Sequence, residues 1–215
     1  MRPVILIGAG GLAREVVALL EGSADHKPIG LLDDDTALHG KDIAGLPVLG
    51  GIDSVREHTD SDILVCTGSG RSRRLIIERL VRLGVDSSRY ATVIAPDVRV
   101  PSDCAVGSGS ILLAGVVLTA SVSIGRHAVL MPHAVCTHDD RVGDYATLCA
   151  GVTLGGSVEI GDEAYLGMNS AVKQNVRVGT CAVLGMGSVL LADLPADEVW
   201  VGNPARAIEY GESRE

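Results

Sequence analysis

The chain has 215 residues, of which 47% are hydrophobic and 2% aromatic, and its formal net charge at pH 7 is −9. This apolar content excludes a disordered chain, and an acidic chain without a basic stripe is not expected to bind nucleic acid. No apolar run reaches the ~18 residues of a membrane span, the N-terminus does not read as a signal peptide, and five cysteines without paired spacing favour a reducing, cytoplasmic location.

Residues 1–90 alternate strand and helix signals. Val4–Ile7 is a short apolar run, and apolar residues then recur at helical spacing from Leu12. Further strands are expected at Ile29–Leu32, Leu46–Val48 and Ile63–Cys66, and a second helix over Arg71–Leu83 that ends at Gly84. This alternation predicts an α/β fold, a Rossmann-like half domain with a parallel sheet and crossover helices.

A glycine-rich loop lies between the first predicted strand and helix. Gly8-Ala9-Gly10-Gly11-Leu12-Ala13 fits the pattern G-x-G-x-x-A, which lets a phosphate approach the backbone at a helix N-terminus. Asp33 follows this loop at roughly the spacing of a ribose-binding acid. Thr67–Gly70 ends another strand and could line the same crevice. Half of a dinucleotide fold suits a mononucleotide better than NAD, while tight strand–helix packing alone would also require glycines.

The second part of the chain is a repeat with a period of six. Every sixth residue from Ile94 to Leu190 is apolar without exception, often followed by glycine, with a small residue four positions on. This period is the hexapeptide signature of a parallel β-helix, three hexads to a triangular coil, with residues three hexads apart stacked over about five coils. The aliphatic residue is expected to point inward, the small residue to fit beside the corner, and the glycine to tolerate the turn. We therefore expect a β-helix domain over residues 91–194 and a tail over 195–215.

The hexads are least regular around a histidine. Cys136 replaces the aliphatic residue, and Asp140 stands where a small residue is usual. Because local rules tend to break at functional sites, His138 is a candidate general base with Asp139 as a carboxylate that orients it. The alternative reading is an ordinary polar surface turn.

Three histidines of the repeat point to a metal site as an alternative. His127, His133 and His138 could together bind zinc, as in γ-class carbonic anhydrases, whose fold is similar. No motif for a nucleophilic serine or cysteine stands out, so direct transfer is favoured over a covalent intermediate.

Taken together, Gly8–Gly11, Gly30–Asp35, the hexads, His138-Asp139 and Val201–Arg206 resemble one family over nearly the whole chain. It is the sialic acid O-acetyltransferase-like group of hexapeptide-repeat acyltransferases, which includes the nucleotide-linked amino-sugar N-acetyltransferases of bacillosamine and perosamine synthesis. The resemblance implies a left-handed β-helix and a homotrimer with active sites between subunits.

The resemblance also implies roles for individual residues. The nucleotide sugar would bind Gly8, Gly10, Gly11, Asp33 and Asp34, with Gly68 and Ser69 beside them. His138 would be the general base, Asp139 would orient it, and a Gly156 N–H would hold the thioester oxygen. Acetyl-CoA would lie against Gly167, Met168, Pro204 and Arg206, with Lys173 among the cations that offset its charge.

The implied function is acetyl-CoA-dependent N-acetylation of a nucleotide-linked 4-amino sugar, without a metal. The alternatives are O-acetylation of a sugar hydroxyl, a carbonic anhydrase-like metalloprotein, and a non-catalytic nucleotide-sugar-binding protein. Two residues depart from the family pattern: Thr147 stands where a second histidine is frequent, and Asp140 replaces a small or apolar residue.

Overall fold

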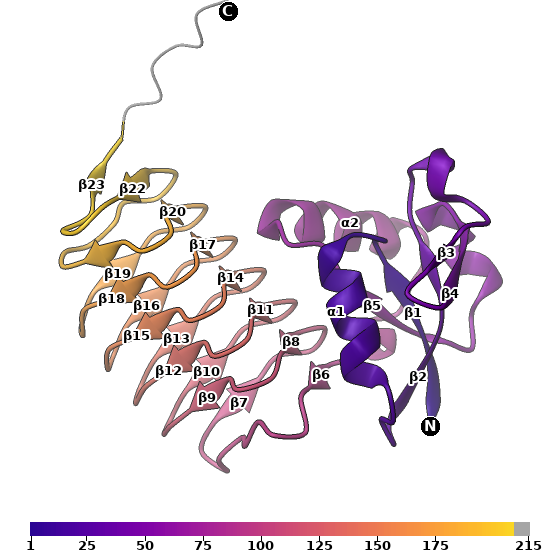
Figure 1. Cartoon of the computed structure of the whole chain (residues 1–215), viewed down its shortest axis with the longest axis horizontal. Helices are drawn as coiled ribbons and strands as arrows, with labels where there is room; N and C mark the ends of the chain where they lie inside the picture. The colour runs from indigo at the N-terminus through magenta and orange to yellow at the C-terminus, as the bar shows by residue number, and fades with distance from the viewer. Residues whose placement is uncertain (209–215) are drawn as a thin grey trace, which may run out of the picture. The chain divides into compact units, whose positions relative to one another are not determined.

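The computed structural model describes residues 1–208 and divides into two compact units (Figure 1). The first contains residues 1–93 with 108–110, and the second contains residues 94–107 with the described residues from 111 onward. Within residues 1–208, none of the helices is long and apolar enough to cross a membrane.

The first unit contains a five-stranded sheet with the strand order β3-β4-β2-β1-β5. The strands are β1 (Arg2–Ile7), β2 (His26–Leu32), β3 (Asp42–Ile43), β4 (Leu46–Gly50) and β5 (Asp62–Val65). Four of them run parallel, and only β3 pairs antiparallel, with β4. Because β2 and β5 lie on opposite sides of β1, the strand order reverses at β1, which is where open α/β sheets bind ligands.

Two α-helices accompany this sheet. Helix α1 (Gly11–Leu20) buries the apolar stripe that its spacing predicts, and α2 (Gly70–Arg82) is followed by Gly84 with φ +83°. The parallel sheet predicted from strand–helix alternation is confirmed. The antiparallel β3 and the 3₁₀ segments η1 (Thr36–Leu38), η2 (Ile52–Glu57) and η3 (Ser87–Arg89) were not predicted, because segments this short carry no apolar period.

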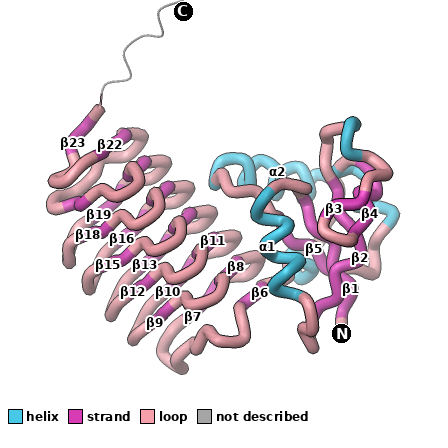
Figure 2. The backbone as a smooth tube through the Cα atoms, viewed as in Figure 1, coloured by secondary structure: helices cyan, strands magenta, loops and turns pink. Residues whose placement is uncertain are grey.

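The second unit is a parallel β-helix built from short strands (Figure 2). One face consists of β7 (Ala105–Val106), β10 (Ser123–Ile124), β13 (Arg141–Val142), β16 (Glu159–Ile160) and β19 (Arg177–Val178). The next consists of β6 (Val93–Ile94), β8 (Ile111–Leu112), β11 (Val129–Leu130), β14 (Thr147–Leu148), β17 (Tyr165–Leu166), β20 (Val183–Leu184), β22 (Val199–Val201) and β23 (Arg206–Ala207). The third consists of β9 (Val117–Leu118), β12 (Val135–Cys136), β15 (Thr153–Leu154), β18 (Ala171–Val172) and β21 (Val189–Leu190). Strands three hexads apart pair in parallel, as in Ser123 with Arg141.

The hexad aliphatic residues form the core of this prism. From Leu112 to Leu190 every one is at most 5% exposed, and the small residues four positions on are fully or almost fully buried, as predicted. The prediction of inward burial is wrong for Ile94 and Val100, which are 36% and 37% exposed. They belong to the first coil, where β6 ends its sheet next to β8, so a neighbouring coil of the helix covers them on one side only.

The turns of the prism are made differently from the prediction. Every sixth residue from Gly109 to Gly187 has a positive φ, and most of these residues are not glycine. The glycines that follow the aliphatic residues are not among them. A Cβ on Gly107, Gly125, Gly143 or Gly161 would come within 2.6 Å of atoms in the next coil. These glycines therefore allow close approach between coils rather than a left-handed turn.

Candidate active site

The turn after β12 carries the His138–Asp139 pair. Asp139 occupies the left-handed position of the turn with φ +63°, a conformation that a short aspartate tolerates. This places its Oδ2 2.8 Å from Nδ1 of His138, and both side chains are exposed. The contact requires Nδ1–H to donate to the carboxylate. In the neutral ring, Nε2 then keeps its lone pair and can accept a proton.

Gly156, one coil further on, seats the imidazole. A Cβ at this position would lie 2.4 Å from both Cε1 and Nε2 of His138, so the ring rests against the glycine backbone. The two turns are joined by Ser157 N–H, which donates to the carbonyl of His138 at 2.9 Å. Among the described residues, the Gly156 N–H has no hydrogen-bond acceptor, whereas its carbonyl accepts from Asn175. A basic nitrogen thus lies next to a glycine whose N–H has no acceptor among the described residues.

Asp140 follows the pair and turns inward. Its side chain is fully buried, and its two oxygens accept from the N–H groups of Thr137 at 2.7 Å and Val158 at 2.9 Å. Burial raises the pKa of the Asp140 carboxyl from 3.8 to about 6, against these two bonds, which favour the ionised form.

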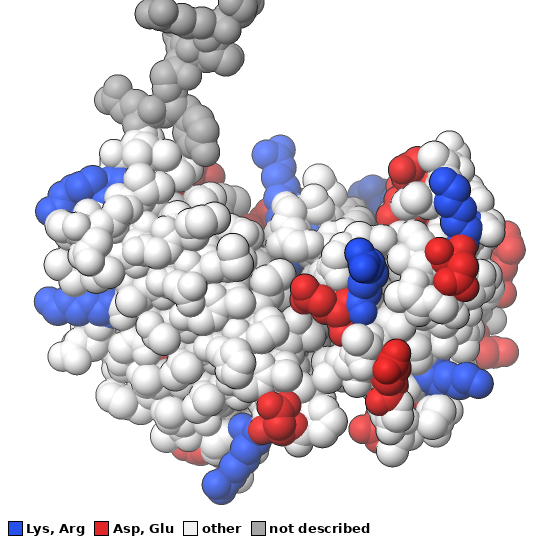
Figure 3. All heavy atoms as spheres, viewed as in Figure 1, with Lys and Arg blue, Asp and Glu red and all other residues white. Residues whose placement is uncertain are grey.

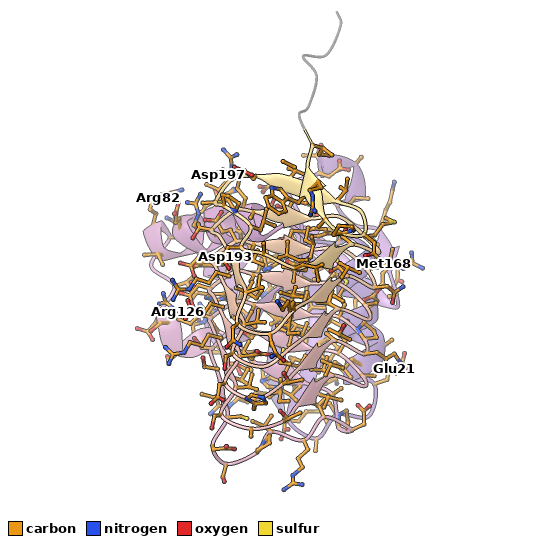
Figure 4. The ribbon with its side chains drawn as sticks, turned by 90° about the vertical axis from the view of Figure 1, so that its left-hand side faces the viewer. Glu21, Arg82, Arg126, Met168, Asp193 and Asp197 are labelled. Carbon is orange, nitrogen blue, oxygen red and sulfur yellow. The ribbon has the colours of Figure 1, made fainter. Side chains whose placement is uncertain are left out.

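The residues expected to contact acetyl-CoA fall on two edges of the prism. Gly156 and the exposed Lys173 follow β15 and β18, on the edge of His138. Gly167 and Met168 follow β17, on another edge. In Figure 4, Met168 lies on the side of the β-helix opposite Arg126, which follows β10 of the face that contains β7. A single chain therefore does not bring the two groups together.

The last two of these residues lie in the turn after β22, which contains Pro204, and at the start of β23, where Arg206 is the first residue. Val189 N–H donates to the carbonyl of Gly202, and Gly187 N–H donates to that of Met168, which stacks this turn on the edge of Met168. Pro204 and Arg206 are exposed there. Part of the tail expected over residues 195–215, namely 209–215, lies outside the described residues, while β22 adds one more strand to the prism.

In the first unit, the carboxyl ends of β1, β2 and β5 meet around Gly8. Its φ is +100°, its N–H donates to Leu32 of β2, and a Cβ would lie 3.1 Å from the side chain of Thr67 after β5. Only glycine fits this position without strain. Asp33 holds the same loop, because its Oδ2 accepts from Ala9 N–H at 2.8 Å.

The glycine loop leaves a helix N-terminus open. Gly10 is the N-cap residue of α1, has no side-chain cap, and has no atom within 4 Å of the place where its Cβ would be; the same space is open at Gly11. The first N–H groups of α1 are therefore available to an anion. Ser69, by contrast, is the N-cap of α2, where its hydroxyl accepts from Ser72 N–H at 3.3 Å.

The two acids predicted to bind the base or ribose already have partners within the fold. Asp33 also accepts from Asp35 N–H, while Asp34 accepts from Ile52 N–H and forms an ion pair with Arg79. Burial opposes ionisation of Asp34, but the hydrogen bonds from Arg79 and Ile52 N–H, together with the charge of Arg79, lower the pKa of its carboxyl overall. Both acids hold loops in place, and their contact with a ligand stays a prediction.

Arg73 was not identified from the sequence. It is fully buried, and its Nη1 donates to the carbonyls of Thr67 at 2.7 Å and Gly68 at 3.1 Å, which positions the loop beside Gly8. Burial lowers the pKa of its guanidinium to about 10. Its spacing in the sequence could have indicated that it is buried, because Arg73 lies on the same helical stripe as the buried Ile77 and Leu80.

The zinc alternative does not fit a single chain. His127, His133 and His138 follow β10, β11 and β12, which belong to three different faces, so they turn on three different edges. His127 instead stacks on Tyr145 with ring centroids 5.4 Å apart. Within residues 1–208, no cluster of three or more histidine, cysteine or acidic side chains could hold a metal. Thr147, at the other departure from the family pattern, is fully buried.

Comparisons with known proteins agree with both units. The family model described as the PglD N-terminal domain matches residues 3–80, whereas no curated protein matches. The acetyltransferase domain of PglB from Neisseria gonorrhoeae is 29% identical, with a TM-score of 0.88 over 97% of this chain and 100% of that one.

Two further solved structures extend the comparison. PerB from Caulobacter crescentus, in complex with CoA and GDP-perosamine, is 29% identical, with a TM-score of 0.87 over 96% of this chain and 97% of that one. WeeI from Acinetobacter baumannii, at 24% identity, shares the fold, with a TM-score of 0.81 over 97% of this chain and 100% of that one.

The chain thus combines a Rossmann-like half domain that has an open glycine loop with a left-handed β-helix in which a histidine rests against a glycine. It matches these acetyltransferases over nearly its whole length. The chain is an acyltransferase, and it is similar to nucleotide-linked amino-sugar N-acetyltransferases of the hexapeptide-repeat type.

Proposed function

We propose that the protein transfers the acetyl group of acetyl-CoA directly to the amine of a nucleotide-linked 4-amino sugar, with His138 as general base. The observation that carries the proposal is the contact of His138 Nδ1 with Asp139, which leaves Nε2 as the basic nitrogen beside Gly156. The PerB structure, which holds CoA and GDP-perosamine, supports the two substrate classes.

The chemistry follows from this geometry. The neutral sugar amine attacks the thioester carbonyl, and Nε2 of His138 takes the amine proton as the C–N bond forms. The negative oxygen of the tetrahedral intermediate accepts the Gly156 N–H, an interaction typically worth about 3 kcal/mol. The C–S bond then breaks, and the imidazolium returns its proton to the sulfur, so that CoA leaves as a thiol. Asp139 stabilises the imidazolium while it exists.

The first unit supplies a site for the nucleotide. Gly8, Gly10 and Gly11 let phosphates approach the N-terminus of α1, where free N–H groups and the helix dipole favour negative charge. Gly68 and Ser69 lie in the adjacent loop, which Arg73 holds. A site that relies on backbone donors recognises a phosphate and does not select the base.

Acetyl-CoA would bind between subunits of a homotrimer. Gly156 and Lys173 lie on one edge of the prism, and Gly167, Met168, Pro204 and Arg206 on another. Two neighbouring prisms could bring these edges together, which one chain cannot do. The outward residues of the face β9–β12–β15–β18–β21 are mostly apolar, with Val117 44% exposed, and much of the β-helix surface seen in Figure 3 is uncharged. Such a face suits packing against a second copy.

The test measures thiol release from acetyl-CoA in the presence of UDP-, dTDP- or GDP-linked 4-amino sugars. We expect release with one of them, and a loss of about 10²- to 10⁴-fold in kcat for His138→Ala. Sugars with a hydroxyl in place of the amine test O-acetylation in the same assay.

His133→Asn is the matched control, because His133 is a turn histidine on another edge and asparagine tolerates its φ of +61°. It should keep the wild-type rate. No release with any amino sugar, or equal rates for His138→Ala and wild type, would contradict the proposal.

A further inference from the structure

One interior position of the β-helix departs from all its counterparts. Four residues after each hexad aliphatic residue, from residue 110 to 188, the chain places a fully or almost fully buried Ser, Ala or Val, except at Asp140. A carboxylate inside a narrow apolar prism is costly unless its oxygens are hydrogen-bonded. Asp140 is 0% exposed and lies between Val122 and Val158 in its column of the stack.

The partners of this carboxylate lie on both sides of the proposed active site. Oδ2 accepts from Thr137 N–H, the residue before His138, and Oδ1 accepts from Val158 N–H, two residues after Gly156. The Thr137 hydroxyl adds a third link by donating to the carbonyl of Leu154 at 3.1 Å. At the same place in the next two coils, Val158 and Val176 have side chains that cannot accept a hydrogen bond.

We propose that Asp140 is a positioning residue that ties the His138 turn to the Gly156 turn and so fixes the imidazole over the glycine backbone. This inference rests on the proposed function for its effect on catalysis. Asp140 is fully buried and does not touch substrate, so it acts through the geometry of His138 and the Gly156 N–H. A displacement of about 1 Å between such groups can lower a rate on the order of 100-fold.

The link that Asp140 makes between the His138 turn and the Gly156 turn, here called the tether, should depend on pH. Burial brings the pKa of Asp140 to about 6, and a protonated carboxyl can no longer accept both N–H groups through charged oxygens. Two other charges act on it: His138⁺ favours the ionised form, and Asp139 opposes it. The buried Cys136 thiol is close enough to feel Asp140, which adds to the rise of the thiol pKa that burial causes, while Val122 and Val158 above and below do not titrate.

The experiment compares wild type with Asp140→Ser and Asp140→Asn. Serine already occupies the equivalent buried positions 110, 170 and 188, so the fold accepts it there. We expect Asp140→Ser to lower kcat about tenfold at pH 7.5 with little change in KM for acetyl-CoA, and Asp140→Asn, which keeps one acceptor, to fall between. Because protonation of His138 affects all three proteins, the readout is the ratio of wild-type to Asp140→Ser kcat. That ratio should fall towards one at pH 5, with a midpoint near pH 6.

A second measurement does not depend on activity. In wild type, the backbone amide NMR signals of Thr137 and Val158 should titrate together with a midpoint near pH 6, and this transition should be absent in Asp140→Ser. Ser170→Ala is the control, because the Ser170 hydroxyl is buried without a hydrogen-bond partner; it should keep both rate and pH profile.

The outcomes separate the two proposals. If wild type transfers no acetyl group but the two amides titrate, the proposed function fails while the tether stands. If wild type is active and the kcat ratio stays constant from pH 5 to 7.5, or the amides do not titrate, the positioning role of Asp140 is overturned.

Discussion

The two units prepare a site by opposite means. The α/β unit has no repeat, and its candidate site is backbone: a glycine at φ +100°, an uncapped helix N-terminus, and loops held by Asp33 and Arg73. The β-helix gives the inward positions of the hexad a fixed environment, and its candidate site includes an exception to it. Asp140 stands out because its counterparts along the stack are all Ser, Ala or Val, whereas His138 and Gly156 occupy a turn position at which residue types vary. A strict repeat thus makes function visible as deviation, whereas a singular loop does not.

Among the changes that test this comparison, adding one carbon at Gly156 of the β-helix site should have the largest effect. In Gly156→Ala, the new Cβ would meet the His138 ring at 2.4 Å, so the imidazole must leave its seat. We expect kcat to fall about 100-fold while the circular dichroism spectrum and melting temperature stay close to wild type, since the backbone here does not require glycine. Gln174→Ala, at the same turn position one coil on, is the control and should keep its activity. Full activity of Gly156→Ala would mean that the β-helix site does not depend on the contact between His138 and Gly156.

The contribution of Asp140 to the stability of the β-helix should vary with pH. The folded-state pKa of Asp140 is raised from 3.8 to about 6, so its contribution to stability is fully present below pH 3.8 and is lost as pH rises through 6. A shift of this size corresponds to about 3 kcal/mol. Wild type should therefore lose thermal stability relative to Asp140→Asn between pH 4 and 7.5, measured as the difference in melting temperature at each pH. A difference in melting temperature that does not change with pH would mean that burial does not raise the pKa of Asp140.

The smallest effect should separate two glycines of the first unit. Gly10 has φ −86° and open space around it, so Gly10→Ala should leave the melting temperature unchanged and raise KM for the nucleotide sugar about tenfold, because only an approaching phosphate meets the methyl group. Gly8→Ala should instead lower the melting temperature, since φ is +100° and Thr67 lies 3.1 Å away. Unchanged KM in Gly10→Ala would show that no ligand comes close to this loop.

The regular parts of both units could be predicted from the sequence. The hexad period identifies the prism and its core, and strand–helix alternation identifies the parallel sheet. Isolated contacts could not be predicted: that Gly156 seats the ring, that Asp140 bridges two turns, or that Arg73 is buried beneath a loop. The hexad period predicts which residues of neighbouring coils stack, but it does not predict how their side chains and backbone groups meet, and it says nothing of helix–loop packing. The role of the hexad glycines was misread for a similar reason, since close approach between coils is a non-local requirement.

The register of one coil on the next has a consequence for how such a chain can change in length. Inserting or deleting a single residue within a strand would put every later inward side chain out of register, whereas the gain or loss of one whole coil preserves all later contacts. Natural or engineered variants should therefore differ by whole coils in the regular part of the prism, while the last coil, in which Val199 pairs with Val183 only 16 residues earlier, is the place where a shorter coil is accepted. One interval is closed even to this change: a coil added between His138 and Gly156 would separate the base from its oxyanion donor while leaving the prism itself whole.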